Sequence, residues 1–165
     1  MDTTHNEVTD RHLRSTIGFE ILVQDVMTRD VITILKYDSI MNVAHILSEK
    51  NISGLPVVDK GRNVIGIITQ ADILSMVGVR KEHTFKDLLK HVLGEPLPEQ
   101  KIGDIVGDIM VSPAVTIKPN ATIAEAAQIM DEKRVRRLPV VDDKNMLLGI
   151  ISRADILKAV LRKLK

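Results

Sequence analysis

Two short motifs place a hydroxyl residue and a carboxylate three residues apart, directly after an apolar Gly-Ile-Ile run. They are Thr69 with Asp72 and Ser152 with Asp155. If a strand ends at the hydroxyl and a helix begins near the carboxylate, the pair can cap the helix. A carboxylate beside exposed backbone donors can also bind the two vicinal hydroxyls of a ribose. The spacing alone does not choose between these two roles.

The other polar residues form no recognisable catalytic set. The chain has five histidines without metal-ligand spacing, and it has no cysteine. No nucleophile with its base, no P-loop and no dinucleotide fingerprint occurs. We therefore expect no catalytic residue and no metal site. Gly66 and Gly149 are predicted to allow tight strand packing rather than to bind phosphate. The basic segment Lys133–Arg137 is either a solvated helix end or a phosphate-binding group.

Composition limits the classes of partner. The 165 residues include 23 Lys and Arg against 22 Asp and Glu, which gives a net charge of +1. This balance disfavours a general polyanion binder. One tyrosine and two phenylalanines are too few for a platform that stacks single-stranded nucleic acid. Because no apolar run could span a bilayer and no signal peptide opens the sequence, we expect a soluble cytoplasmic protein that contacts no membrane.

The chain contains an internal duplication. When Val23–Leu74 is aligned with Val106–Leu157 at a constant offset of 83, 22 of the 52 pairs are identical. One identical block, Leu-Pro-Val-Val-Asp, occupies Leu55–Asp59 and Leu138–Asp142. The two hydroxyl–carboxylate motifs also coincide. Such self-similarity indicates two copies of one supersecondary unit.

Each copy is predicted to have the order β-α-β-β-α. The first strands are expected at Val31–Ile34 and Ala114–Ile117, and helices capped at Ser39 and Thr122 should follow them. The buried helix faces are predicted to comprise Ile40, Val43, Ala44 and Leu47 in the first copy, and Ile123, Ala126, Ala127 and Met130 in the second. The later strands are predicted at Leu55–Val58, Val64–Ile68, Leu138–Val141 and Leu147–Ile151, with second helices from Ala71 and Ala154.

These elements predict an α/β fold of the α+β kind, with two β-α-β-β-α repeats packed with pseudo-two-fold symmetry. One copy alone would bury too little apolar surface to be stable. The predicted boundaries are an N-terminal arm at 1–22, repeats at 23–82 and 106–165, and a helical linker at 83–105. The linker is too long for a bare loop, and it is predicted to contain a helix at Thr84–Leu93. Lys158–Lys165 should continue the last helix.

The motifs resemble those of a known family. The Leu-Pro-Val-Val-Asp strand, the Gly-Ile-Ile-[Thr/Ser]-x-Ala-Asp turn and the openings Asp25-Val26-Met27 and Asp108-Ile109-Met110 occur in order in both copies. Over about Val23–Lys165 the chain resembles a tandem pair of CBS domains, the module named after cystathionine β-synthase. The resemblance implies that the cleft between the repeats binds an adenine nucleotide or a related adenosyl compound.

The resemblance also implies which residues contact such a ligand. The pairs Thr69 with Asp72 and Ser152 with Asp155 would bind ribose. The remaining contacts would be Ile52, Ser53, Gly54, Val135 and Arg136 at the adenine, Thr33 and Thr116 at the pocket margin, and Arg137 at a phosphate. Because Ser53-Gly54 replaces Arg136-Arg137 in the first copy, the two sites should be unequal. The site with Asp155 and Arg137 should prefer a phosphorylated ligand, whereas the site with Asp72 should be weaker or empty.

The function that the resemblance implies is regulatory. A non-catalytic sensor would bind AMP, ADP, ATP or S-adenosylmethionine and signal by a conformational change, across a homodimer or to an unidentified regulated protein. No cofactor would be required besides this regulatory ligand. The alternative is a homodimerising interaction module with vestigial ligand clefts. Nucleic-acid binding through Lys133–Arg137 and the basic tail is a third possibility, which the near-zero net charge disfavours.

Overall fold

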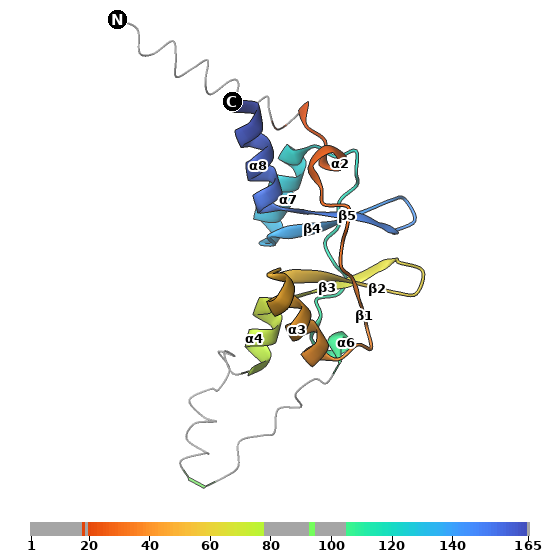
Figure 1. Cartoon of the computed structure of the whole chain (residues 1–165), viewed down its shortest axis with the longest axis vertical. Helices are drawn as coiled ribbons and strands as arrows, with labels where there is room; N and C mark the ends of the chain where they lie inside the picture. The colour runs from red at the N-terminus through yellow and green to blue at the C-terminus, as the bar shows by residue number, and fades with distance from the viewer. Residues whose placement is uncertain (1–17, 19, 78–92, 95–104, 165) are drawn as a thin grey trace, which may run out of the picture. The chain divides into compact units, whose positions relative to one another are not determined.

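The structure is a computed structural model that describes residues 18, 20–77, 93–94 and 105–164 (Figure 1). In chain order, the elements are α2 (Val23–Val26), β1 (Ile34–Leu35), α3 (Ile40–Lys50), β2 (Gly54–Val58), β3 (Val64–Thr69), α4 (Gln70–Val77), α6 (Val106–Ile109), α7 (Ile123–Lys133), β4 (Arg137–Val141), β5 (Leu147–Ser152) and α8 (Arg153–Leu164). The predicted α+β architecture is confirmed. Within these ranges no helix is long and apolar enough to cross a bilayer. Except for Leu93, the predicted helix Thr84–Leu93 lies outside the described residues, as does most of the arm 1–22.

The two long helices that follow the first strands begin where the sequence supplies a cap. At α3, Ser39 Oγ accepts a hydrogen bond from Asn42 N at 3.1 Å. At α7, Thr122 Oγ1 accepts one from Glu125 N at 3.2 Å, while Glu125 Oε2 accepts one from Thr122 N at 2.8 Å. This reciprocal pair is a capping box, which satisfies two backbone donors at the helix start. Both predicted caps are therefore confirmed.

The described residues form two compact units that differ from the two sequence repeats. Unit 1 comprises 18, 20–32, 60–64 and 114–164, and unit 2 comprises 33–59, 65–77, 93–94 and 105–113. After α2, Thr28 exchanges two backbone hydrogen bonds of 2.9 Å with Ile150 of β5, inside unit 1. After α6, Val111 exchanges bonds of 2.8 and 3.0 Å with Ile67 of β3, inside unit 2. The opening helix of each repeat therefore belongs to the unit that contains the other repeat's last strand.

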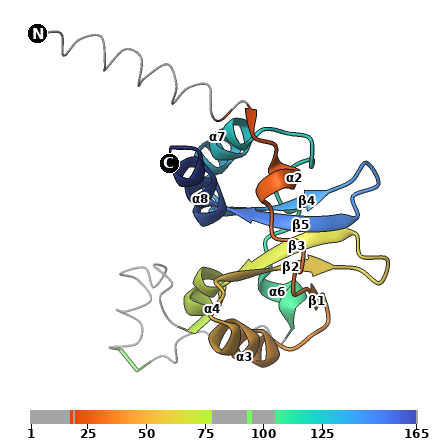
Figure 2. The same ribbon diagram turned by 45° about the horizontal axis from the view of Figure 1, so that its top comes forward.

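Unit 1 is built on the antiparallel pair β4–β5, with α7 and α8 beside it (Figures 1 and 2). Leu138 pairs with Ile151, and Arg137 pairs with Ser152. From its second residue onward β4 is buried at every position, whereas β5 alternates between buried and more exposed residues. The core consists of Val23, Met27, Ile117, Ile123, Ala126, Met130, Leu138, Val140, Ile151 and Ala159.

Unit 2 contains a three-stranded sheet in the order β1-β2-β3, with α3 and α4 beside it (Figure 1). β1 runs parallel to β2, and Ile34 pairs with Val57. The core consists of Ile34, Val43, Leu47, Leu55, Val57, Ile68 and Val106. Each unit therefore has its own hydrophobic core.

The predictions for the two first strands are wrong in extent. β1 is Ile34–Leu35 rather than Val31–Ile34, and no strand forms over Ala114–Ile117. Ile117 makes a single parallel bridge, in which its N–H donates to Pro139 O at 3.0 Å. The next donor in a parallel ladder would be residue 119, which is a proline and has no N–H. The ladder therefore stops after one residue.

Two smaller predictions are also wrong. Ala127 is exposed although Ile123, Ala126 and Met130 are buried, because this short side chain lies at the margin of the apolar stripe. The second helices begin at Gln70 and Arg153, one residue earlier than predicted. The tail does continue α8, which extends to Leu164.

Candidate functional site

The hydroxyl–carboxylate pair of the first repeat closes the junction between β3 and α4. Thr69 is the last residue of β3, and α4 begins at the next residue. Asp72 Oδ2 accepts hydrogen bonds from Thr69 N at 2.8 Å and from Thr69 Oγ1 at 2.9 Å. Asp72 N donates to Thr69 Oγ1 at 3.3 Å. The turn is therefore a capping box in which two donors of Thr69 hold one carboxylate oxygen of Asp72, while the Thr69 hydroxyl accepts the backbone N–H of Asp72.

The second repeat builds the same turn between β5 and α8. Asp155 Oδ2 accepts hydrogen bonds from Ser152 N at 2.9 Å and from Ser152 Oγ at 3.0 Å, and Asp155 N donates to Ser152 Oγ at 3.2 Å. The capping role is thus present in both repeats. Both carboxylates are half-buried, and within the described part of the chain Oδ1 of neither makes a hydrogen bond. This oxygen is available to a ligand, so capping and ligand binding are compatible.

Each turn lies beside the start of the neighbouring strand. Gln70 N donates to Ser53 O at 2.9 Å, and Arg153 N donates to Arg136 O at 3.0 Å. The backbone predicted to line an adenine therefore meets the predicted ribose-binding turn in both repeats. We call these groups edge site 1 (Ile52, Ser53, Gly54, Thr69 and Asp72) and edge site 2 (Val135, Arg136, Arg137, Ser152 and Asp155).

A left-handed residue directs the chain from each helix into its edge site. Asn51 has φ 52° at the end of α3, and Arg134 has φ 54° at the end of α7. The next residue returns a hydrogen bond to the helix in both cases: Ile52 N donates to Leu47 O at 3.2 Å, and Val135 N donates to Met130 O at 3.0 Å. Such a turn ends the helix and fixes the direction of the following backbone.

Thr33 and Thr116 form no hydrogen bond with the edge sites in the part of the chain that the structure describes. Each is half-buried and directly precedes a residue that pairs with a strand, Ile34 with β2 and Ile117 with β4. In the described ranges no hydrogen bond links either threonine to a turn residue or to the start of β2 or β4. Their predicted place in the pocket stays a prediction.

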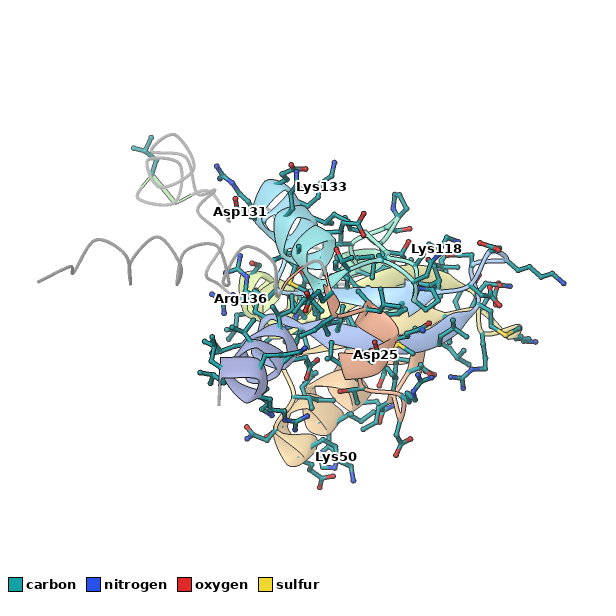
Figure 3. The ribbon with its side chains drawn as sticks, turned by 90° about the horizontal axis from the view of Figure 1, so that it is seen from above. Asp25, Lys50, Lys118, Asp131, Lys133 and Arg136 are labelled. Carbon is teal, nitrogen blue, oxygen red and sulfur yellow. The ribbon has the colours of Figure 1, made fainter. Side chains whose placement is uncertain are left out.

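The two edge sites differ in charge. Arg136 and Arg137 of edge site 2 align with the neutral Ser53 and Gly54 of edge site 1. Arg136 is exposed and is labelled, together with Lys133, in Figure 3, whereas Arg137 is half-buried. A guanidinium offers a fork of donors that matches phosphate oxygens. Among these aligned positions, only those of the second repeat supply side chains suited to a phosphate.

One position at the edge sites was missed in the sequence analysis. Gln70 Nε2 donates to Ile52 O at 3.2 Å, so this side chain lies against the backbone segment of edge site 1. At the offset of 83 its counterpart is Arg153, which is exposed. A comparison of the variable position in the two Gly-Ile-Ile-[Thr/Ser]-x-Ala-Asp turns would have revealed this change of charge. The backbone contact that gives it meaning is visible only in the fold.

Comparison with known families and structures decides the family. The CBS domain model matches the chain twice, over residues 23–78 and 106–162. The chain belongs to the CBS domain family. A similar relative is the Uncharacterized protein MJ1404 of Methanocaldococcus jannaschii, which is 36% identical over 157 residues. The alignment covers 95% of this CBS-domain chain and 36% of that protein, so the chain spans about a third of that relative's length.

Two solved CBS-domain structures share the fold and contain adenosine compounds. CBSX2 of Arabidopsis thaliana in complex with AMP has a TM-score of 0.71 and 26% identity, covering 88% of this chain and 99% of that one. The CBS domain pair of protein MJ0100, in complex with 5′-methylthioadenosine and S-adenosyl-L-methionine, has a TM-score of 0.67 and 27% identity, covering 86% and 97%. The predicted tandem CBS pair is therefore confirmed.

Proposed function

We propose that this CBS-domain chain is a non-catalytic regulatory module that binds an adenosine-type ligand at its edge sites. The candidates are AMP, ADP, ATP and S-adenosylmethionine. The observation that carries the proposal is the duplicated turn, in which a half-buried carboxylate keeps one oxygen unbonded within the described structure. An ionised carboxylate oxygen accepts hydrogen bonds from ribose hydroxyls. The adenosine complexes of CBSX2 and MJ0100 support this chemistry.

The two edge sites are expected to bind unequally. Edge site 2 combines Asp155 with two arginines and favours a phosphorylated ligand, because charge-assisted hydrogen bonds to phosphate are strong. Edge site 1 combines Asp72 with neutral residues and binds such a ligand more weakly or stays empty. The charge difference between the aligned positions supports this order.

A titration with AMP, ADP, ATP and S-adenosylmethionine tests the proposal. A ligand that binds only the folded chain stabilises it by about 2.7 kcal/mol at a concentration of 100 times its Kd. We expect at least one of the four to raise the unfolding temperature and to give a saturable heat in calorimetry. If none of them binds, the chain is not an adenosine sensor, and the interaction module with vestigial clefts takes its place.

The output of such a sensor is proposed to be a conformational change that passes to a partner. A ligand shifts a conformational equilibrium only by its difference in affinity for the two states. Small-angle scattering with and without saturating ligand checks this step. The conformational change could act on a separate regulated protein or on the second subunit of a homodimer.

A homodimer is supported by an exposed apolar stripe on α8. Leu157, Leu161 and Leu164 are spaced for one helix side and are 61%, 51% and 51% exposed. These leucines do not belong to the side of α8 that packs on the core of unit 1, which carries Ile156, Ala159 and Val160. An exposed leucine row of this kind is typical of a helix that packs against another surface, and a two-fold axis would pair two such rows.

The double substitution Leu157→Glu and Leu161→Glu is expected to convert the proposed dimer to a monomer. The row on each copy of the chain would then carry two negative charges that face the like charges of the other copy. The apolar area that favours association of the two rows would also be lost. Sedimentation velocity measures the mass of the parent and of the double variant. A parent chain that sediments as a monomer contradicts the homodimer.

A further inference from the structure

The charge contrast between the two edge sites extends beyond the arginines that align with Ser53 and Gly54. Gln70 begins α4, and its counterpart Arg153 begins α8. The three aligned positions are therefore Ser53, Gly54 and Gln70 in the first repeat, and Arg136, Arg137 and Arg153 in the second. The formal charge changes from 0 to +3. Because both repeats fold into the same turn, the fold itself does not require these cations.

The backbone brings these three positions to one place. Arg153 N donates to Arg136 O at 3.0 Å, and Arg137 is paired across the hairpin with Ser152, the residue before Arg153. The carboxylate of Asp155 closes the same turn. The side chains of the three arginines thus start from neighbouring backbone positions, beside the turn that the predicted ribose-binding carboxylate closes.

The first repeat shows how far a side chain at this helix position reaches. Gln70 Nε2 contacts Ile52 O, in the backbone predicted to line the adenine. The arginine at the same position in the second repeat is longer and exposed. In the described part of the chain neither Arg136 nor Arg153 forms an ion pair with a carboxylate. Cations that are not neutralised within the protein attract an anionic ligand.

We propose that edge site 2 selects adenosine ligands with two or more phosphates, and that Arg153 is a specificity-determining residue for the additional phosphates. This inference rests on the proposed adenosine-binding function. One arginine pair suffices for a single phosphate, since each guanidinium binds two oxygens. A third cation gains a partner only when the phosphate chain is longer. Adenosine should bind with little dependence on Arg153, and ATP with a strong dependence.

The test uses calorimetric titration of the full chain with adenosine, AMP, ADP and ATP at constant ionic strength. The parent and the variant Arg153→Gln both carry Asp72→Ala, which removes the carboxylate of edge site 1. Arg153→Gln installs the residue of the first repeat. We expect ATP to bind the parent more tightly than AMP, and R153Q to reduce this ratio about tenfold through loss of a charge-assisted hydrogen bond. Adenosine affinity should not change.

Lys158→Gln is the matched control, because it removes one positive charge from an exposed position of α8 five residues beyond Arg153. The ATP-to-AMP ratio should stay at the parent value in K158Q, and Arg153→Lys should restore part of it. An unchanged ratio in R153Q overturns the inference. So does an equal loss for adenosine and ATP, or an equal effect of K158Q. If the parent binds none of the four compounds, it is the proposed function that fails.

Discussion

Replacing Asp155 with alanine is expected to weaken the binding of AMP by about 1.5 kcal/mol or more, which is roughly tenfold in Kd. The reason is that the variant loses Oδ1, the carboxylate oxygen that the turn does not use. A ribose hydroxyl would then lose a hydrogen bond to a charged acceptor, and such bonds contribute more net free energy than bonds between neutral groups. Isothermal titration calorimetry of the parent and variant measures the difference directly.

The control must separate ligand binding from helix capping, because Asp155 does both in this proposal. Glu125 supplies the matched variant, since it occupies the same third helical position of a capping box at α7. Loss of either carboxylate should reduce the free energy of unfolding by about 1 kcal/mol. Only Asp155→Ala should also reduce AMP affinity. If Asp155→Ala and Glu125→Ala both bind AMP like the parent, the ribose assignment is wrong.

The helices and hairpins could be predicted because their signals are local. The cap at Ser39, the capping box at Thr122 and the Leu-Pro-Val-Val-Asp strands each depend on neighbouring residues, and the structure contains all of them. Local signals could not predict that α2 and α6, the opening helix of each repeat, belong to the unit that contains the other repeat's last strand. This arrangement depends on backbone pairs such as Thr28 with Ile150, which are far apart in the sequence.

The candidate site was predictable to the same extent. The hydroxyl–carboxylate turns and the adjoining backbone follow from motifs that each lie within a few residues. The reach of Gln70 to Ile52 joins a helix start to a chain segment 18 residues earlier, and no local pattern predicts it. The predicted first strand of the second repeat, which is reduced to a single bridge at Ile117, is an intermediate case. Pro119 is visible in the sequence, but its effect requires the register of Ile117 with Val140.

Replacing Gly149 with alanine is expected to destabilise the chain by about 2 kcal/mol or more, within the range for overpacked cores. A Cβ at this position would lie 2.7 Å from Met27 Sδ and 2.8 Å from Thr28 O. The methionine can move, but Thr28 O already accepts the hydrogen bond from Ile150 N at 2.9 Å. Relief of the clash would therefore break the backbone pair that attaches the α2 segment to β5. The prediction that this glycine serves tight packing is confirmed.

Gly66, the residue of the first repeat that aligns with Gly149, is packed in the same way. A Cβ on Gly66 would lie 2.9 Å from Met110 Sδ and 2.9 Å from Val111 O, so Gly66→Ala should cost a similar amount. Gly107→Ala is the contrasting control, because the two atoms nearest to its Cβ belong to the exposed side chain of Lys36, Cγ at 2.8 Å and Cε at 3.1 Å, which can rotate away, and the nearest backbone atom, Lys36 O, is farther off at 3.3 Å. Urea unfolding followed by circular dichroism measures all three variants. Adding Met27→Ala to Gly149→Ala should not restore stability, since the carbonyl of Thr28 still blocks the new methyl group and Met27 belongs to the core of unit 1. A Gly149→Ala variant as stable as the parent would mean that the α2 segment is not bound to β5 as the structure has it.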